Sequence, residues 1–205
     1  MLGSHQLLRA ALQQDHPYVV GLDVSLTSTG VYLLSLNPDD DHPDFHYHIT
    51  TKPKDNSDAS RIDFIVDTVV TDLTNPQYPV IAACMEDYGP SGRIAGKVLV
   101  RAELCGVLKH LLRYRVKIPY VTISPNGLKK VATGSGRSQK GQSSKDAMLR
   151  AANEAGFITK NSDEADAYHA AQFCAAFVRG EKLAADYRRV NPMGYTFSEN
   201  PFQSA

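Results

Sequence analysis

The 205-residue sequence lacks the features that mark membrane, exported or disulfide-rich proteins. It has no stretch of about 18 apolar residues, the length at which a membrane-spanning helix is predicted. Its N-terminus does not show the basic and then apolar pattern of an export signal. The cysteines Cys84, Cys105 and Cys174 are odd in number, far apart and set in apolar surroundings, which indicates reduced core thiols. We therefore expect a soluble cytoplasmic protein.

The sequence also lacks a net charge, with 22 basic and 22 acidic residues, but the charges are segregated along the chain. Residues 39–87 contain eleven Asp or Glu and three Lys or Arg, whereas residues 93–145 contain twelve Lys or Arg and one acidic residue, Glu103. Such segregation produces a positive field that neutralises phosphates, and it indicates contact with nucleic acid. The alternative is a dipolar surface without a partner.

No internal repeat is present, and 205 residues suffice for one good hydrophobic core. We expect an N-terminal leader (1–17), one catalytic domain (18–180) and a loosely ordered tail (181–205). Apolar patterning predicts strands at 18–23, 30–36, 45–51, 79–85 and 119–123, and helices at 57–73, 93–114, 124–131, 145–155 and 164–179. The order predicts an α/β fold whose five-stranded mixed sheet has three antiparallel strands, then two parallel ones, and is flanked by helices.

Four acidic residues occupy the ends of these elements. Asp23 ends a β-rich run where it meets a hairpin turn, and Glu86 ends a buried strand. Asp163 and Asp166 stand three residues apart at the start of a helix, where they share a face. Carboxylates gathered closely repel one another unless cations bind between them, so the pattern indicates Mg²⁺ or Mn²⁺. Taken singly, each acid can also have a structural role without a metal. Asp166 would then be a solvated helix residue, Asp163 a helix cap, and the other two the first residues of loops.

The combination of motifs resembles the RuvC-type Holliday-junction resolvases of the ribonuclease-H-like superfamily. Segment 21–30 (GLDVSLTSTG) is similar to their first motif, a strand-borne Asp followed by a turn and Thr-Gly. Cys84-Met85-Glu86 resembles the second motif, and residues 163–167 (DEADA) resemble the third. Segment 128–140 is similar to the lysine-bearing loop, with Lys129 and Lys140 at the matching positions. Four motifs in the same order make the match specific, although each alone is weak.

The resemblance implies a homodimeric enzyme that hydrolyses phosphodiesters of branched DNA in the cytoplasm of a bacterial cell or phage-infected host. Asp23, Glu86, Asp163 and Asp166 would bind two Mg²⁺ (or Mn²⁺) ions, which in such sites lie about 3.5 to 4 Å apart. Lys140 and Lys129 would stabilise charge in the transition state or only grip phosphate. The side chains expected to contact DNA are Tyr88, Arg93, Lys97, Arg101, Lys130, Arg137 and Lys145.

Two departures from the family pattern stand out. Val24-Ser25 replaces the usual Pro-Gly after the first Asp, as in divergent phage or mobile-element members. Gly89 stands where the family has an aromatic residue, so Tyr88 either substitutes for that residue or is an ordinary loop tyrosine. His169, three residues after Asp166, either touches the metal site or is a core or surface histidine.

Other functions remain open on the sequence alone. A debranching nuclease that cuts forks and flaps would share every motif, and so would a junction-binding protein without catalysis. The first motif also resembles the phosphate loop of the sugar-kinase and actin ATPases. That fold needs two duplicated halves, and a chain of this length without a repeat is too short for both.

Overall fold

The computed structural model describes residues 16–37, 43–52, 57–87, 96–135 and 143–181. One sheet contains the strands β1 (Tyr18–Asp23), β2 (Ser28–Ser35), β3 (Phe45–Thr50), β4 (Val80–Glu86) and β5 (Tyr120–Ile123). The strands lie in the order β3-β2-β1-β4-β5. Neighbouring strands are antiparallel from β1 to β3 and parallel from β1 through β4 to β5. The predicted mixed sheet is thus confirmed.

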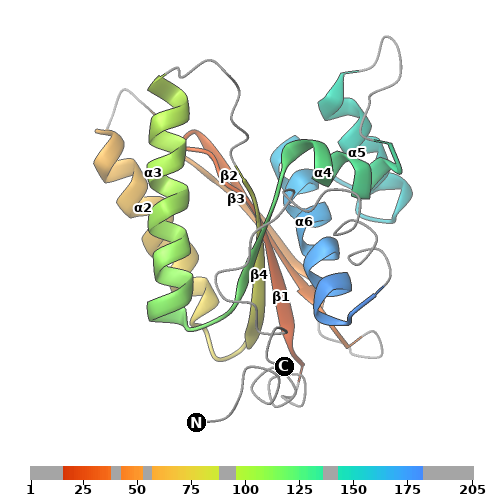
Figure 1. Ribbon diagram of the computed structural model, residues 1–205, viewed down its shortest axis with the longest axis horizontal. Helices are drawn as coiled ribbons and strands as arrows, with labels where there is room; N and C mark the ends of the chain where they lie inside the picture. The colour runs from red at the N-terminus through yellow and green to blue at the C-terminus, as the bar shows by residue number, and fades with distance from the viewer. Residues whose placement is uncertain (1–15, 38–42, 53–56, 88–95, 136–142, 182–205) are drawn as a thin grey trace, which may run out of the picture.

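Helices cover both faces of this sheet (Figure 1). One face carries α2 (Asp58–Leu73) and α3 (Gly96–Leu111), which continues into the π-helix η1 (Leu112–Val116). The other face carries α4 (Pro125–Thr133), α5 (Ser144–Glu154) and α6 (Ser162–Val178). The result is the predicted α/β arrangement of a sheet flanked by helices. The expected tail, apart from residue 181, and the expected leader, apart from residues 16 and 17, lie outside the described residues.

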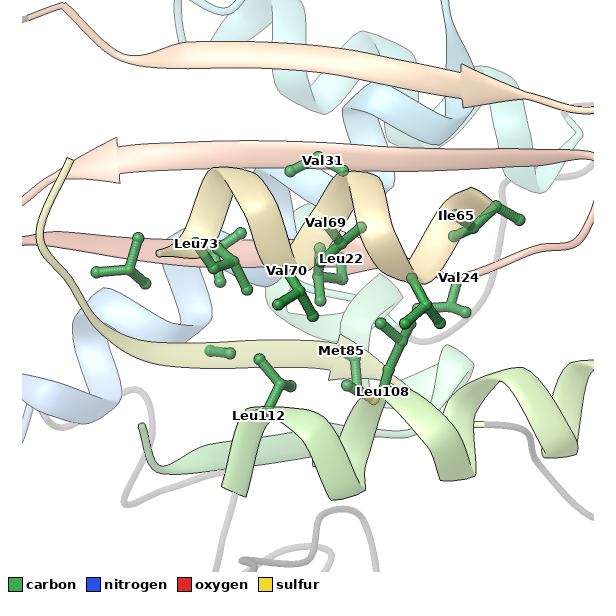
Figure 2. Packing of buried hydrophobic residues seen from close by; sticks show 14 of the residues in the cluster. Leu22, Val24, Val31, Ile65, Val69, Val70, Leu73, Met85, Leu108 and Leu112 are labelled. Carbon is green, nitrogen blue, oxygen red and sulfur yellow. The ribbon is translucent and has the colours of Figure 1, made fainter. Parts of the chain in front are cut away.

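The larger core lies between the sheet and the pair α2 and α3 (Figure 2). Leu22 and Met85 project from the central strands toward Val69 of α2 and Leu108 of α3, and all four are buried. Helix α2 begins at a cap in which the Ser57 hydroxyl accepts a hydrogen bond from the backbone of residue 60. Its apolar residues at three-and-four spacing form the buried face. Burial of each large aliphatic side chain contributes about 1.5 to 3 kcal/mol.

The end of α3 differs from the expected regular helix through Tyr114. The helix widens into the π turn η1, which ends at Lys117 in a left-handed backbone conformation with φ 62°. The Ile118 amide donates to the Leu112 carbonyl at 3.0 Å and closes the turn. Leu112 stays buried while Tyr114 is exposed. A π turn adds one residue to a helical turn, so three-and-four periodicity does not predict it.

The helix α6 packs backbone to backbone against β1 and β2. A Cβ atom at Gly21 would lie 2.0 Å from the Ala167 carbonyl oxygen, and one at Gly30 would lie 2.1 Å from the Asp163 carbonyl oxygen. Only glycine permits such an approach. The seam between these strands and α6 therefore fixes the first turns of α6 beside the end of β1.

All three cysteines are buried and carry free thiols, as predicted. Among the helices that the structure describes, none is both long and apolar enough to cross a membrane.

Candidate active site

Asp23 and Glu86 end neighbouring parallel strands. Leu22 lies opposite Met85 in the register of β1 and β4, so the next residue of each strand reaches the same edge of the sheet. The adjacent Asp87 is engaged elsewhere, because it accepts a hydrogen bond from Lys109 Nζ at 3.2 Å and one from a threonine of β5. Glu86 is therefore the acid of this strand end that joins Asp23.

The turn after Asp23 is held by a local hydrogen-bond network. Thr29 Oγ1 donates to the Ser25 carbonyl at 2.6 Å and accepts from the Ser25 amide at 3.2 Å. Arg61 of α2 is only 4% exposed and donates to the Leu26 carbonyl at 3.0 Å. Buried polar groups that are paired in this way make a turn rigid. The backbone that carries Asp23 is thus anchored on both sides.

Asp163 and Asp166 lie in the first two turns of α6. The Asn161 side chain caps the helix by accepting hydrogen bonds from the amides of Asp163, at 2.8 Å, and Glu164, at 3.4 Å. The helix begins at Ser162, two residues earlier than predicted. The interpretation of Asp163 as the cap is therefore wrong, and its carboxylate is not used for that purpose.

The carboxylates of the two strands and of α6 interact electrostatically. Burial raises the pKa of Asp23 well above its usual value, and the charges of Glu86, Asp166 and Asp163 add to the effect. Burial raises the pKa of Asp166 to about 7, with further repulsion from Glu86 and Asp163. The Asp166 Oδ1 atom is buried and accepts no hydrogen bond from any described part of the chain. The site thus holds more negative charge than its surroundings neutralise.

Three basic side chains, Arg101, Lys145 and Lys129, offset part of this charge. Arg101 Nη2 of α3 lies 3.7 Å from Asp23 Oδ1 and 3.4 Å from Glu86 Oε1. Arg101 was expected to contact DNA, and in this DNA-free structure its guanidinium points to the carboxylates. Burial raises the pKa of Glu86, while the charges of Arg101 and Lys129 lower it in part. The charge of Lys145 and then that of Lys129, which stands at a position matched to the family's lysine-bearing loop, lower the pKa of Asp166 in part.

The remaining predicted residues fall into two groups. Lys145 is near the site, with Nζ 4.0 Å from Asp163 Oδ1 and 3.2 Å from Ser162 Oγ, and Lys130 is exposed on α4. Lys97 belongs to α3, but its side chain is outside the described part of the chain, which also omits Tyr88, Arg93, Arg137 and Lys140 entirely.

His169 is a core residue. It is buried, its Nε2 atom lies 3.1 Å from the Met148 carbonyl oxygen, and burial lowers its pKa. The reading of His169 as a metal-site residue is therefore not supported by its contacts.

One contact near the site was not predicted from the sequence. Glu164 accepts a hydrogen bond from Thr159 Oγ1 at 2.8 Å, and its other oxygen lies 2.8 Å from His48 Nδ1 on β3. This pairing ties the start of α6 to an edge strand. An asparagine followed three residues later by a glutamate, as in Asn161 and Glu164, is a helix-start signal that would have placed the beginning of α6.

The donor set fits a hard divalent cation. Mg²⁺ and Mn²⁺ prefer carboxylate oxygens, and the unpartnered Asp166 oxygen offers one. Within the described residues, no three His, Cys, Asp or Glu side chains are already placed as a metal centre. Arg101 supplies the counter-charge to Asp23 and Glu86 in this structure.

The raised pKa of Asp166 predicts that the metal-free protein loses stability as the pH rises. The folded chain binds this proton with a pKa of about 7, against 3.8 for the ordinary group. The contribution to stability is therefore complete below the lower value and is lost as the pH rises through the upper one. Melting temperatures in a chelator should fall from about pH 5 to about pH 8, and Asp166→Asn should weaken the trend. Identical trends in both proteins would contradict the assignment.

No protein-family model and no curated protein matches the sequence. Solved structures do match, and they show that the chain has the ribonuclease-H-like fold found in RuvC-type Holliday-junction resolvases. The predicted fold is thereby confirmed.

Three of the similar structures come from Thermus thermophilus and from yeast. RuvC of Thermus thermophilus is 16% identical, with a TM-score of 0.55, over 86% of this chain and 98% of that one. The same organism's RuvC in complex with a Holliday junction substrate is 17% identical, with a TM-score of 0.56, over 88% and 100%. The yeast mitochondrial Holliday junction resolvase Ydc2 is 14% identical, with a TM-score of 0.51, over 91% and 88%. Such low identity fits the divergent motifs of this chain.

Proposed function

We propose that this protein is a divalent-metal-dependent endonuclease that resolves four-way junctions or other branched DNA. The observation that carries the proposal is that Asp23 and Glu86, at the ends of adjacent parallel strands, and Asp166, on α6, lie close enough for the charge of Glu86 to raise the pKa values of both aspartates. The named structures of similar fold support the substrate class, because one contains a Holliday junction and another is a Holliday junction resolvase. The nuclease domain would span residues 18–180.

Each residue of the site has a role in this proposal. Asp23, Glu86, Asp163 and Asp166 would hold two Mg²⁺ or Mn²⁺ ions. At these carboxylates the ions would supply Lewis-acid activation of water and counter-charge for the phosphate. The strand ends and the capped start of α6 keep the carboxylates in place, and Lys129 lies where its charge acts on the same region. Lys140 is proposed as a second lysine that acts on the phosphate of bound DNA.

The paired lysines of α4 offer a matched test of this scheme. Lys129 is half-buried and acts on the site carboxylates, whereas its neighbour Lys130 is exposed. Lys129→Ala should lower the single-turnover cleavage rate by about 10², the lower end of the loss for one electrostatic group. Lys130→Ala should weaken DNA binding slightly and leave the rate at saturating enzyme unchanged. Equal rates for the two variants would remove Lys129 from catalysis.

A homodimer is the second part of the proposal, since a two-fold-symmetric junction calls for a symmetric enzyme. The outer side of α3 and η1 carries the exposed apolar side chains Leu99, Val107 and Tyr114. We propose that a second copy of this chain covers them. Sedimentation of the wild type beside Leu99→Glu tests this, with a shift from dimer to monomer expected.

Incubation of the purified protein with a synthetic four-way junction tests the main proposal. Paired nicks that require Mg²⁺ or Mn²⁺ are expected. Equal cutting of forks and flaps would instead identify a general debranching nuclease, and tight binding without cutting under any metal would identify a junction-binding protein. As a resolvase of cellular or phage DNA, the protein would act in the cytoplasm of a bacterial cell or phage-infected host.

A further inference from the structure

The Arg101 side chain points from α3 toward the two acidic strand ends. It reaches from α3 to the sheet edge, and one of its nitrogens, Nη2, is shared between Asp23 and Glu86 at 3.7 and 3.4 Å. Both distances exceed the roughly 2.7 to 2.9 Å of a tight charge-assisted hydrogen bond. Its Nε atom is buried and finds no acceptor in the described ranges. The guanidinium is therefore held by charge and by one long hydrogen bond, which Nη2 donates to Glu86 Oε1 at 3.4 Å.

We propose that Arg101 is a positioning residue that serves as the exchangeable counter-ion of the site. Before DNA binds, its guanidinium neutralises Asp23 and Glu86. When a branched substrate arrives, the guanidinium transfers to a DNA phosphate and leaves the two carboxylates to a divalent cation. This inference rests on the proposed function and adds the order in which the site is filled.

The exchange follows from the charges involved. A guanidinium and a divalent cation that share the oxygens of Asp23 and Glu86 repel each other, so full metal binding requires Arg101 to withdraw. Arginine keeps its charge at all accessible pH values, so loss of a proton is not a route for withdrawal. A phosphate offers two oxygens to the planar guanidinium, which is a better geometry than the single shared nitrogen seen here. The Arg101 side chain is 29% exposed, so an incoming phosphate can reach it.

This exchange couples DNA binding to metal binding. A ligand that removes Arg101 from the carboxylates raises their affinity for the cation, and by reciprocity the cation raises the affinity for DNA. A purely structural arginine would behave in the opposite way, because its loss would loosen Asp23 and Glu86 and weaken metal binding. The sign of the effect on metal affinity therefore separates the two roles.

Calorimetric titration of the DNA-free protein with Mn²⁺ measures this sign without any cleavage. Arg101→Gln should bind Mn²⁺ about tenfold more tightly than wild type, the scale that Coulomb's law gives for a unit charge and a divalent ion about 6 Å apart in water. Arg101→Lys keeps the charge and should bind as wild type does. Arg150→Gln is the matched control, since Arg150 is an exposed arginine of α5 that pairs with Glu154. Unchanged or weaker binding by Arg101→Gln would overturn the proposal.

A second titration keeps the proposal testable if Arg101→Gln does not fold. Wild-type protein should bind Mn²⁺ more tightly in the presence of a four-way junction made uncleavable by phosphorothioate linkages, after correction for Mn²⁺ bound by the junction alone. No change would overturn the exchange. Wild-type protein that binds no Mn²⁺ with or without the junction would instead overturn the metal-dependent function itself, so the two failures are distinguishable.

Discussion

The Glu86→Gln protein should cut a four-way junction more slowly than wild type by about 10³ or more, since loss of one preorganised electrostatic group already costs about 10² to 10³. The substitution keeps the shape of the side chain and removes the negative charge of Glu86, which acts on Asp23 and Asp166. It also relieves repulsion, so the metal-free variant should be at least as stable as wild type. Junction affinity should change little. Single-turnover cleavage, chemical unfolding and junction binding measure the three quantities.

Asp87→Asn is the matched control for this variant. Asp87 is the next acid along the chain, but it pairs with Lys109 and stays out of the site. Its cleavage rate should remain within a few-fold of wild type. If Glu86→Gln retains near-normal turnover, or if Asp87→Asn loses as much activity as Glu86→Gln, Glu86 is not the metal-binding acid of this strand.

Gly30→Ala should lower both the stability of the protein and its cleavage activity. The added methyl group would lie 2.1 Å from the Asp163 carbonyl oxygen and 2.5 Å from its carbon, and these are backbone atoms that side-chain rotation cannot move. Helix α6 must shift away from β2, which carries Asp163 and Asp166 away from Asp23. Overpacking of this kind costs about 1 to 3 kcal/mol, or more where backbone must move. Denaturant unfolding and cleavage assays measure the two losses.

Gly106→Ala supplies the contrast. Gly106 lies within α3, and a Cβ atom there would meet no described atom within 4 Å. Because alanine favours the helix over glycine, the free energy of unfolding should rise by about 0.5 to 1 kcal/mol. A Gly30→Ala protein as stable as Gly106→Ala would show that α6 does not rest on the strand as described.

The strand ends of the site could be predicted from the sequence because their signals are local. The run that leads to Glu86 is continuously apolar, as expected for a strand buried on both faces, and Asp23 ends a β-rich segment. Parallel pairing of these strands then brings both acids to one edge. Asp163 and Asp166 were predicted to share a helix face by their spacing alone.

The direction of Arg101 could not be predicted in the same way. The sequence places Arg101 within a predicted helix. Which side of that helix meets the carboxylates depends on how the helix crosses the sheet, and contacts between residues far apart in the sequence set that crossing. The same limit applies to Asp87, whose separation from Glu86 depends on Lys109 in α3 and Thr122 in β5. The π turn after Leu111 was missed because it interrupts the periodicity that the prediction relied on.

The close packing of α6 against β1 and β2 implies that the residues packed on the two faces of the sheet change at different rates during evolution. On the side of α2 and α3, one aliphatic residue can replace another of similar volume at a cost of under about 1.5 kcal/mol, so that core is free to drift. At Gly21 and Gly30 nothing larger fits, and Ala167 and Ala171 face the first of them with backbone atoms. A search for remote homologues would gain more from these small residues, in register with the acids, than from overall identity.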